Sequence, residues 1–271
     1  MSAAHRAWLE HLREKFLTSG LTIAELAQRA GWSKSKVSEL LRGAGLYPRW
    51  EITHGLLHVL GVPTRPMRRL RTAAAREARK KQDWIDGCIT KVVVSTGPAV
   101  PPLDHLGFTE LNRGAYTAYA RVFLRRDEAE RTVAETSDVL WLRWEDVLVS
   151  SDVQKFSWQI LRRGVMARTP HIDGYPELTH AVFDTVVLSK TSGPAGFNQI
   201  EESLRLFQAI SRLPPFQLDV LVLRYMRGMG EEAVADVLGA PIASVSSADR
   251  HAQRSLANAL NSSTAPGGTL Q

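Results

Sequence analysis

The sequence has one cysteine, Cys88, in 271 residues. A single thiol cannot form a disulfide within the chain, which excludes a disulfide-stapled scaffold and fits a reducing cytosol. No apolar run approaches the roughly 18 residues that a membrane helix needs. The first residues mix charged and apolar side chains, unlike a signal peptide. We therefore expect a cytoplasmic protein with no membrane partner.

Motifs of common enzymes are also missing. The sequence has no glycine-rich phosphate loop, no Gly-x-Ser-x-Gly elbow and no paired active-site carboxylates on defined strands. His54 and His58 have the spacing of two metal ligands on one helix face, but no cysteine or third histidine lies near them. The sequence thus predicts neither an enzyme nor a cofactor nor a metal site.

Basic charge is concentrated at one end of the chain. The net charge is +6, yet residues 1–91 hold 17 Lys and Arg against 8 Asp and Glu. The rest of the chain holds 17 basic and 20 acidic residues. A positive surface attracts polyanions, so we expect any contact with nucleic acid in the first third of the chain.

Apolar residues recur at helical spacing along most of the chain, beginning with Trp8, Leu12 and Phe16. The proline- and glycine-rich stretch from Ser95 to Pro102 reads as a linker. The one candidate strand, Cys88 to Val94, is too short and isolated to build a sheet. These patterns predict an all-α fold of three helical units. The expected divisions are an N-terminal domain at 1–85, a linker at 86–107, a helical domain at 108–170, a connector at 171–198, a helical domain at 199–260 and a disordered tail at 261–271.

Two stretches fit a helix-turn-helix, which needs a small residue between the helices, a turn residue that tolerates positive φ, and a β-branched core residue in the second helix. The matching residues, at identical gaps of four and six, are Ala27, Gly31 and Val37, and Ala235, Gly239 and Val245. Before the first frame, Thr22 and Glu25 have capping-box spacing, and Ser33 is placed to cap the next helix.

The first frame has side chains suited to DNA. With Val37 facing inward, lysines and serines occupy the leading part of the recognition helix, where they can reach base edges and phosphates. The predicted DNA-binding residues are Ser33, Lys34, Ser35, Lys36, Ser38, Arg42 and Arg49. A basic stripe follows, whose residues either clamp the DNA backbone or form a solvated face. Its members are Arg68, Arg69, Arg71, Arg76, Arg79, Lys80 and Lys81.

Residues 5–80 resemble the Cro and lambda-repressor type of DNA-binding domain, the xenobiotic-response-element family. The resemblance lies in Leu21-Thr22-x-x-Glu25-Leu26-Ala27-x-x-Ala30-Gly31-x-Ser33-x-x-x-Val37-Ser38-x-x-x-Arg42-Gly43, and Tyr47-Pro48-x-Trp50 is similar to a variant in actinobacterial members. It implies a five-helix bundle whose third helix enters the major groove, often as a homodimer on a palindrome.

The rest of the chain resembles bacterial RNA polymerase sigma factors of the extracytoplasmic-function group. Residues 199–260 are similar to region four through Leu213-Pro214, Leu221-x-Leu223-x-Tyr225, Gly228-Met229-Gly230 and Val234-Ala235-x-x-Leu238-Gly239-x-Pro241. Residues 108–170 are similar to region two through Glu128-Ala129-Glu130, Val133-x-Glu135-Thr136 and Leu140-Trp141.

This second resemblance implies further site residues. Polymerase contacts would be Glu128, Glu130, Glu135 and Trp141, and promoter melting would use Trp158, Arg162 and Arg163. The second helix-turn-helix would present Ser244, Ser246, Ser247, Arg250 and Arg254. Residues 199–260 hold 6 basic and 7 acidic residues, so we expect this to be the weaker DNA reader.

The aromatic residues of the middle section allow two interpretations. Trp141, Trp144 and Trp158, with Phe156, either stack on splayed bases or form a core.

The sequence as a whole predicts a bacterial transcription regulator that binds double-stranded DNA and is nucleoid-associated, with a sigma-like body that contacts RNA polymerase core or promoter DNA. The alternatives are a working sigma factor and an adaptor that sequesters a regulatory protein.

Overall fold

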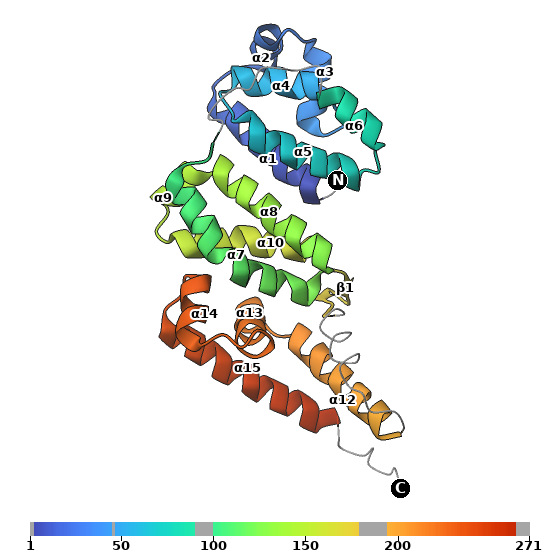
Figure 1. The fold of residues 1–271 in the computed structure, drawn as a ribbon, viewed down its shortest axis with the longest axis vertical. Coiled ribbons are helices and arrows are strands. Elements are labelled where there is room, and N and C mark those ends of the chain that lie inside the picture. Colours follow the sequence, from blue (N-terminus) through green and yellow to red (C-terminus); the bar gives the residue numbers. More distant parts are fainter. Residues whose placement is uncertain (1–2, 45–46, 90–99, 179–193, 264–271) are drawn as a thin grey trace. The chain divides into compact units, whose positions relative to one another are not determined.

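A computed structural model describes residues 3–44, 47–89, 100–178 and 194–263 of the chain (Figure 1). It confirms the predicted all-α fold, since the described residues form helices except for loops and one short hairpin. The contacts group the chain into two compact units, Met1–Thr109 with Ala134–Leu148, and Glu110–Val133 with Val149–Gln271. No helix in the described part of the chain is long and apolar enough to cross a membrane.

The first unit contains the N-terminal helices and a later segment of the chain. Its helices are α1 (Ala3–Thr18), α2 (Ile23–Ala30), α3 (Lys34–Arg42), α4 (Trp50–Val59), α5 (Thr64–Glu77), α6 (Gln82–Ile89), the start of α7 (Leu103–Phe123), the end of α8 (Arg126–Leu142) and α9 (Trp144–Val149). Helix α1 packs along α5, and α2 packs against α3 and α4. The predicted apolar face of α1 is confirmed, because Trp8 and Leu12 are fully buried and Phe16 packs at the edge of the same core.

The structure differs from the sequence expectation in several segments. Strands form at His171–Ile172 and Tyr175–Pro176, and a helix begins at Pro194, all inside the predicted connector. The candidate strand Cys88 to Val94 begins inside α6, so Cys88 and Ile89 are helical, and the remaining residues lie outside the described part. Helix α15 (Ile242–Ser263) continues three residues into the predicted tail. The linker stretch 95–102 is described only from Val100 onward. The predicted domain boundaries stay predictions.

Arg71 of the first unit is a charged residue whose side chain is fully buried. The guanidinium lies 5.4 Å from the ring centre of Tyr47, 6.0 Å from that of Trp50 and 5.3 Å from that of Trp84. Its Nη2 donates to the Pro48 carbonyl at 2.6 Å. A desolvated cation over aromatic faces gains about 2 kcal/mol or more per favourable contact. The Tyr47-Pro48-x-Trp50 motif therefore serves to hold an arginine of α5.

His11 of α1 is buried in the same unit, and neither ring nitrogen has a hydrogen-bond partner among the described residues. Burial, with the nearby charges of Lys15 and Arg143, lowers the pKa of His11 to about 4, while Asp146 opposes the shift. The folded unit therefore holds this ring neutral at pH 7.

We expect the stability of the first unit to fall on mild acidification. The His11 pKa is lower in the folded state than its ordinary value of 6.5, so the unfolded chain binds more protons between these pH values. The His11 contribution to this loss should be about 2 kcal/mol between pH 7 and pH 5, measured by urea denaturation as the difference between the parent and His11→Leu, because the raised pKa of Asp138, about 6, changes stability in the opposite direction in both proteins. His11→Leu should flatten this dependence. His58→Gln, which alters an exposed histidine, should retain it, and equal slopes for all three proteins would refute the assignment.

The second unit contains the rest of α7 and α8 together with the C-terminal elements. These are α10 (Val153–Met166), β1 (His171–Ile172), β2 (Tyr175–Pro176), α12 (Pro194–Ser211), α13 (Pro215–Leu221), the π-helical turn η1 (Val222–Met226), α14 (Glu231–Leu238) and α15. Strands β1 and β2 pair antiparallel. Helices α12, α13 and α14 all pack against α15, and α14 also packs against α10.

Asp219 of α13 joins three helices of this unit. Its carboxylate is almost completely buried and accepts hydrogen bonds from Tyr119 Oη at 2.6 Å, Trp158 Nε1 at 3.2 Å and Arg162 Nε at 2.7 Å. Burial raises the pKa of Asp219, and the Arg162 charge opposes that rise. A buried carboxylate requires such donors, because an unpaired one costs several kcal/mol.

Replacing this carboxylate should destabilise the second unit. We expect Asp219→Asn to lower the free energy of unfolding by about 3 kcal/mol, because Arg162 loses its ionic partner in a largely desolvated site. Chemical denaturation measures the change. Asp236→Asn, an exposed position on α14, makes the same chemical change and should stay within about 0.5 kcal/mol of the parent. Equal stabilities for the two variants would show that the network contributes little.

Candidate nucleic-acid interface

The first helix-turn-helix frame is formed by α2 and α3. Ala27 and Val37 are buried between the helices, and Gly31 ends α2 with φ +72°. A non-glycine residue is strained at that φ, so the glycine lets the chain turn directly into α3. The predicted capping box is confirmed: Glu25 N donates to Thr22 Oγ1 at 3.2 Å, and Thr22 N donates to Glu25 Oε2 at 2.8 Å.

Ser33 is the N-cap of α3, and its hydroxyl accepts a hydrogen bond from the Lys36 backbone at 3.4 Å. This role matches the capping function expected from the sequence. Ser33 is exposed, so the same residue stands at the leading edge of the recognition helix.

The core fixes which side of α3 faces outward. Val37, Leu40 and Leu41 are buried. At about 100° per residue, the positions opposite these three are Ser35, Glu39 and Arg42, and all three are exposed. The rotation of α3 therefore places a hydroxyl, a carboxylate and a guanidinium at the centre of its outward face.

The two lysines lie on the flanks of that face. Lys34 and Lys36 are exposed and sit on opposite sides of α3. The Lys36 ammonium lies 5.5 Å from the centre of the Trp32 ring. Flanking cations suit the two phosphate walls of a groove rather than the base edges at its floor.

The other predicted contacts have mixed environments. Ser38 is half-buried, and its carbonyl accepts a hydrogen bond from Arg42 Nε at 3.3 Å. Arg49 is exposed at the start of α4 and makes no side-chain cap. Both arginines are placed near helix ends of the frame, where phosphate contacts are common.

Glu39 was not among the residues predicted from the sequence. The signal was present in the spacing of Ser35, Glu39 and Arg42, which share a face only once Val37, Leu40 and Leu41 are assigned to the core. Glu39 is acidic, so a pattern of basic residues alone does not identify it.

The basic stripe after the frame divides into different roles. Arg71 is buried in its aromatic surroundings, and Arg69 Nε donates to Asp138 Oδ2 at 2.9 Å. Burial raises the pKa of Asp138 to about 6, against the opposing effect of Arg69. The other members are exposed, and they are Arg68, Arg76, Arg79, Lys81 and Lys80, whose ammonium lies 5.9 Å from the centre of the Trp84 ring. These five exposed residues either contact the DNA backbone or form a solvated face.

The second helix-turn-helix frame has the same geometry in α14 and α15. Ala235 and Val245 are buried, and Gly239 ends α14 with φ +58°. An added Cβ at Gly239 would collide with the backbone nitrogen of Lys155 and lie 2.6 Å from Asp152 Oδ1. Glycine is therefore required here both by the left-handed turn and by close packing on the start of α10.

Polar groups of the second recognition helix are engaged within the unit. Asp249 Oδ2 accepts from Arg224 Nη1 at 2.6 Å and from Tyr225 Oη at 3.0 Å. The Ser246 hydroxyl donates to the Ile242 carbonyl at 3.1 Å and also bonds Glu231. Among the predicted residues, Ser247 is half-buried, and those that are exposed are Ser244, Arg250 and Arg254. The described contacts of this helix thus engage Ser246 and Asp249, while its arginines, Arg250 and Arg254, are exposed.

The predicted polymerase-contact residues lie along α8. Glu130 is exposed and pairs with Arg121 at 2.7 Å and with Arg126 at 3.4 Å. Glu128 and Glu135 are half-buried. Trp141 is only 5% exposed, which leaves little of its ring for a partner in this conformation.

The predicted promoter-melting residues lie on α10. Trp158 is buried and Arg162 half-buried, and both bond Asp219, while Arg163 is exposed. Trp144 is buried against Phe108 and His105. The middle tryptophans thus occupy core positions, as one of the two interpretations of these aromatics expects.

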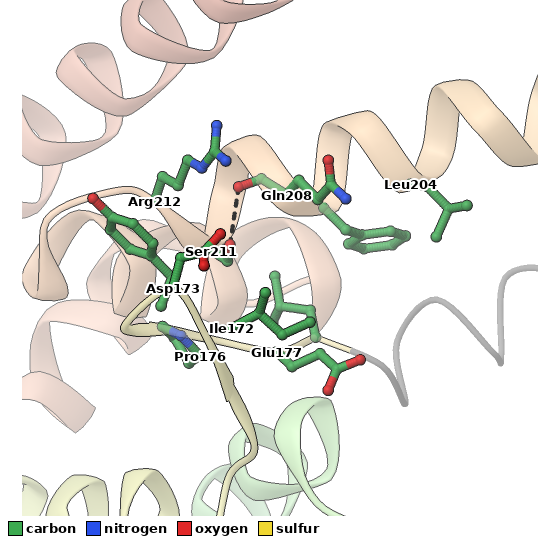
Figure 2. Close-up of a pocket in the computed structure, with 11 residues that line it drawn as sticks. Ile172, Asp173, Pro176, Glu177, Leu204, Gln208, Ser211 and Arg212 are labelled. Carbon is green, nitrogen blue, oxygen red and sulfur yellow. Dashed lines mark hydrogen bonds between the residues drawn. The ribbon is translucent and has the colours of Figure 1, made fainter.

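The second unit also contains a cavity of 220 Å³ between the β1–β2 hairpin and α12 (Figure 2). Leu204 and Phe207 contribute apolar walls, and Asp173, Glu177 and Arg212 contribute charges of both signs. No group of His, Cys, Asp and Glu in the described residues could hold a metal ion.

Comparison with known families supports the first frame. Residues 6–70 match a family described as a helix-turn-helix domain. The match extends from α1 into α5 and includes the whole frame of α2 and α3. No curated protein matches the chain.

Proposed function

We propose that this protein is a sequence-specific DNA-binding transcription regulator that inserts α3 into the major groove. The observation that supports it is the combination of a matched helix-turn-helix domain at residues 6–70 with an exposed polar face on α3, where Ser35 and Arg42 are central and Lys34 and Lys36 flank. The major groove of DNA is wide enough for an α-helix. Side chains on the outward face of the helix can then reach base edges, and side chains on its flanks can reach phosphates.

The charge distribution favours the same partner. The basic surplus of the chain lies in residues 1–91, which contain this domain. Neutralising phosphates releases counterions, so the affinity of a basic domain for DNA falls as salt rises. The rest of the chain holds 20 of its 28 acidic residues.

The flanking lysines give the first test. We expect Lys34→Ala with Lys36→Ala to weaken binding and to reduce the slope of log K against log salt by about 2, since each lysine neutralises one phosphate. The probe is a duplex selected by the full chain from a random-sequence pool, and fluorescence anisotropy at several salt concentrations measures the slope. Lys155→Ala, an exposed lysine of α10, removes charge outside the domain and should leave the slope unchanged. An unaltered slope in the double variant would overturn the assignment of α3.

For the rest of the chain we propose a sigma-like body that contacts RNA polymerase or promoter DNA weakly. The second helix-turn-helix frame, with its left-handed Gly239, supports the region-four resemblance. The burial of Trp158 and the engagement of Arg162 by Asp219 favour a regulator over a working sigma factor, because both side chains are occupied.

Run-off transcription distinguishes the proposed regulator from a working sigma factor and from an adaptor. With core polymerase and the full chain alone, we expect no specific initiation, although the chain binds its selected duplex. Specific initiation would instead establish a working sigma factor. A stable complex with a regulatory protein, together with DNA affinity no better than non-specific, would establish an adaptor.

A further inference from the structure

We infer that Glu39 is the specificity-determining residue of α3 and that its carboxylate accepts a hydrogen bond from the N4 amino group of a cytosine in the target duplex. This inference rests on the proposed function, because it requires α3 to lie in the major groove. It adds a chemical identity to one base pair of the target.

The position of Glu39 follows from the packing of its helix. Val37, Leu40 and Leu41 face the core, which directs Glu39 away from it, between Ser35 and Arg42. Lys34 and Lys36 are displaced to the sides. A helix that approaches DNA with its flanking lysines toward the phosphates therefore presents Glu39 to the groove floor.

The carboxylate is available for such a contact. Glu39 is exposed, and within the described part of the chain its carboxylate forms no hydrogen bond or ion pair. The nearest cation along the same face, Arg42, donates its Nε to the Ser38 carbonyl instead. No described neighbour therefore neutralises the Glu39 carboxylate.

The chemistry of the groove restricts what an acid at this place can bind. An ionised carboxylate only accepts hydrogen bonds, so phosphates, guanine and thymine oxygens repel it. Two donors face the major groove, the N4 amino group of cytosine and the N6 amino group of adenine. Both donors lie beside an acceptor of the paired base, but adenine adds its own N7 acceptor on the other side, whereas cytosine has only C5–H there. Cytosine is the better complement to Glu39.

An alternative role as a solvated surface acid makes a different prediction. A carboxylate that only faced solvent near phosphates would weaken binding to every sequence alike. Its removal would strengthen binding without changing the preferred sequence. The two roles are thus distinguished by sequence preference and not by affinity alone.

The test is selection of duplexes from a random-sequence pool by the full chain, by Glu39→Gln and by Glu10→Gln. We expect the parent to prefer a C·G pair at one position by about tenfold over other pairs. Glu39→Gln should shift that position toward A·T, because an amide pairs with both N6 and N7 of adenine, and should bind the parent's duplex about tenfold more weakly. Glu10 is an exposed acid of α1, so Glu10→Gln makes the same charge change in the same unit and should keep the parent's motif.

The remaining outcomes overturn the inference in distinguishable ways. If Glu39→Gln selects the parent's motif with equal or higher affinity, α3 still reads DNA and Glu39 is a solvated acid. A parent motif with no preferred C·G pair also refutes the cytosine contact while leaving the proposed function standing. If the folded parent enriches no motif, the proposed function fails and the role of Glu39 fails with it.

Discussion

The burial of Val37, Leu40 and Leu41 fixes the rotation of α3, and the functional assignment of the first unit depends on that rotation. Three apolar side chains on one side of a nine-residue helix leave little freedom in how it lies on its neighbours. The left-handed turn at Gly31 sets where α3 begins, and the Ser33 cap holds its first turn. Together these constraints place a carboxylate, and not only cations, on the surface offered to DNA.

The second unit depends on a polar constraint of a different kind. Asp219 is buried, and its carboxylate accepts hydrogen bonds from Tyr119, Trp158 and Arg162. The same fold positions a second helix-turn-helix whose turn glycine touches the start of α10. Trp158 and Arg162, which the sigma-factor resemblance would assign to promoter melting, are here part of this internal network.

Much of the frame geometry was predictable from the sequence, because caps, turn glycines and buried small residues act over a few positions. The capping box at Thr22 and Glu25 and the two turn glycines all formed as expected. Long-range partners were not predictable. Nothing near Arg71 in the sequence identifies Trp84 as a ring that covers it, and nothing near Trp158 identifies Asp219, since each pair meets only through packing of separate helices.

By itself the sequence determined that the chain is helical, that it contains two turn frames of equal spacing, and that its surplus of basic over acidic residues lies in residues 1–91. These properties depend on local periodicity and on composition. Only the tertiary structure decided which arginine of the basic stripe is buried and which tryptophans belong to a core. Burial and helix rotation are set by contacts between distant segments, and those contacts determine whether a charged side chain supports the fold or faces a partner.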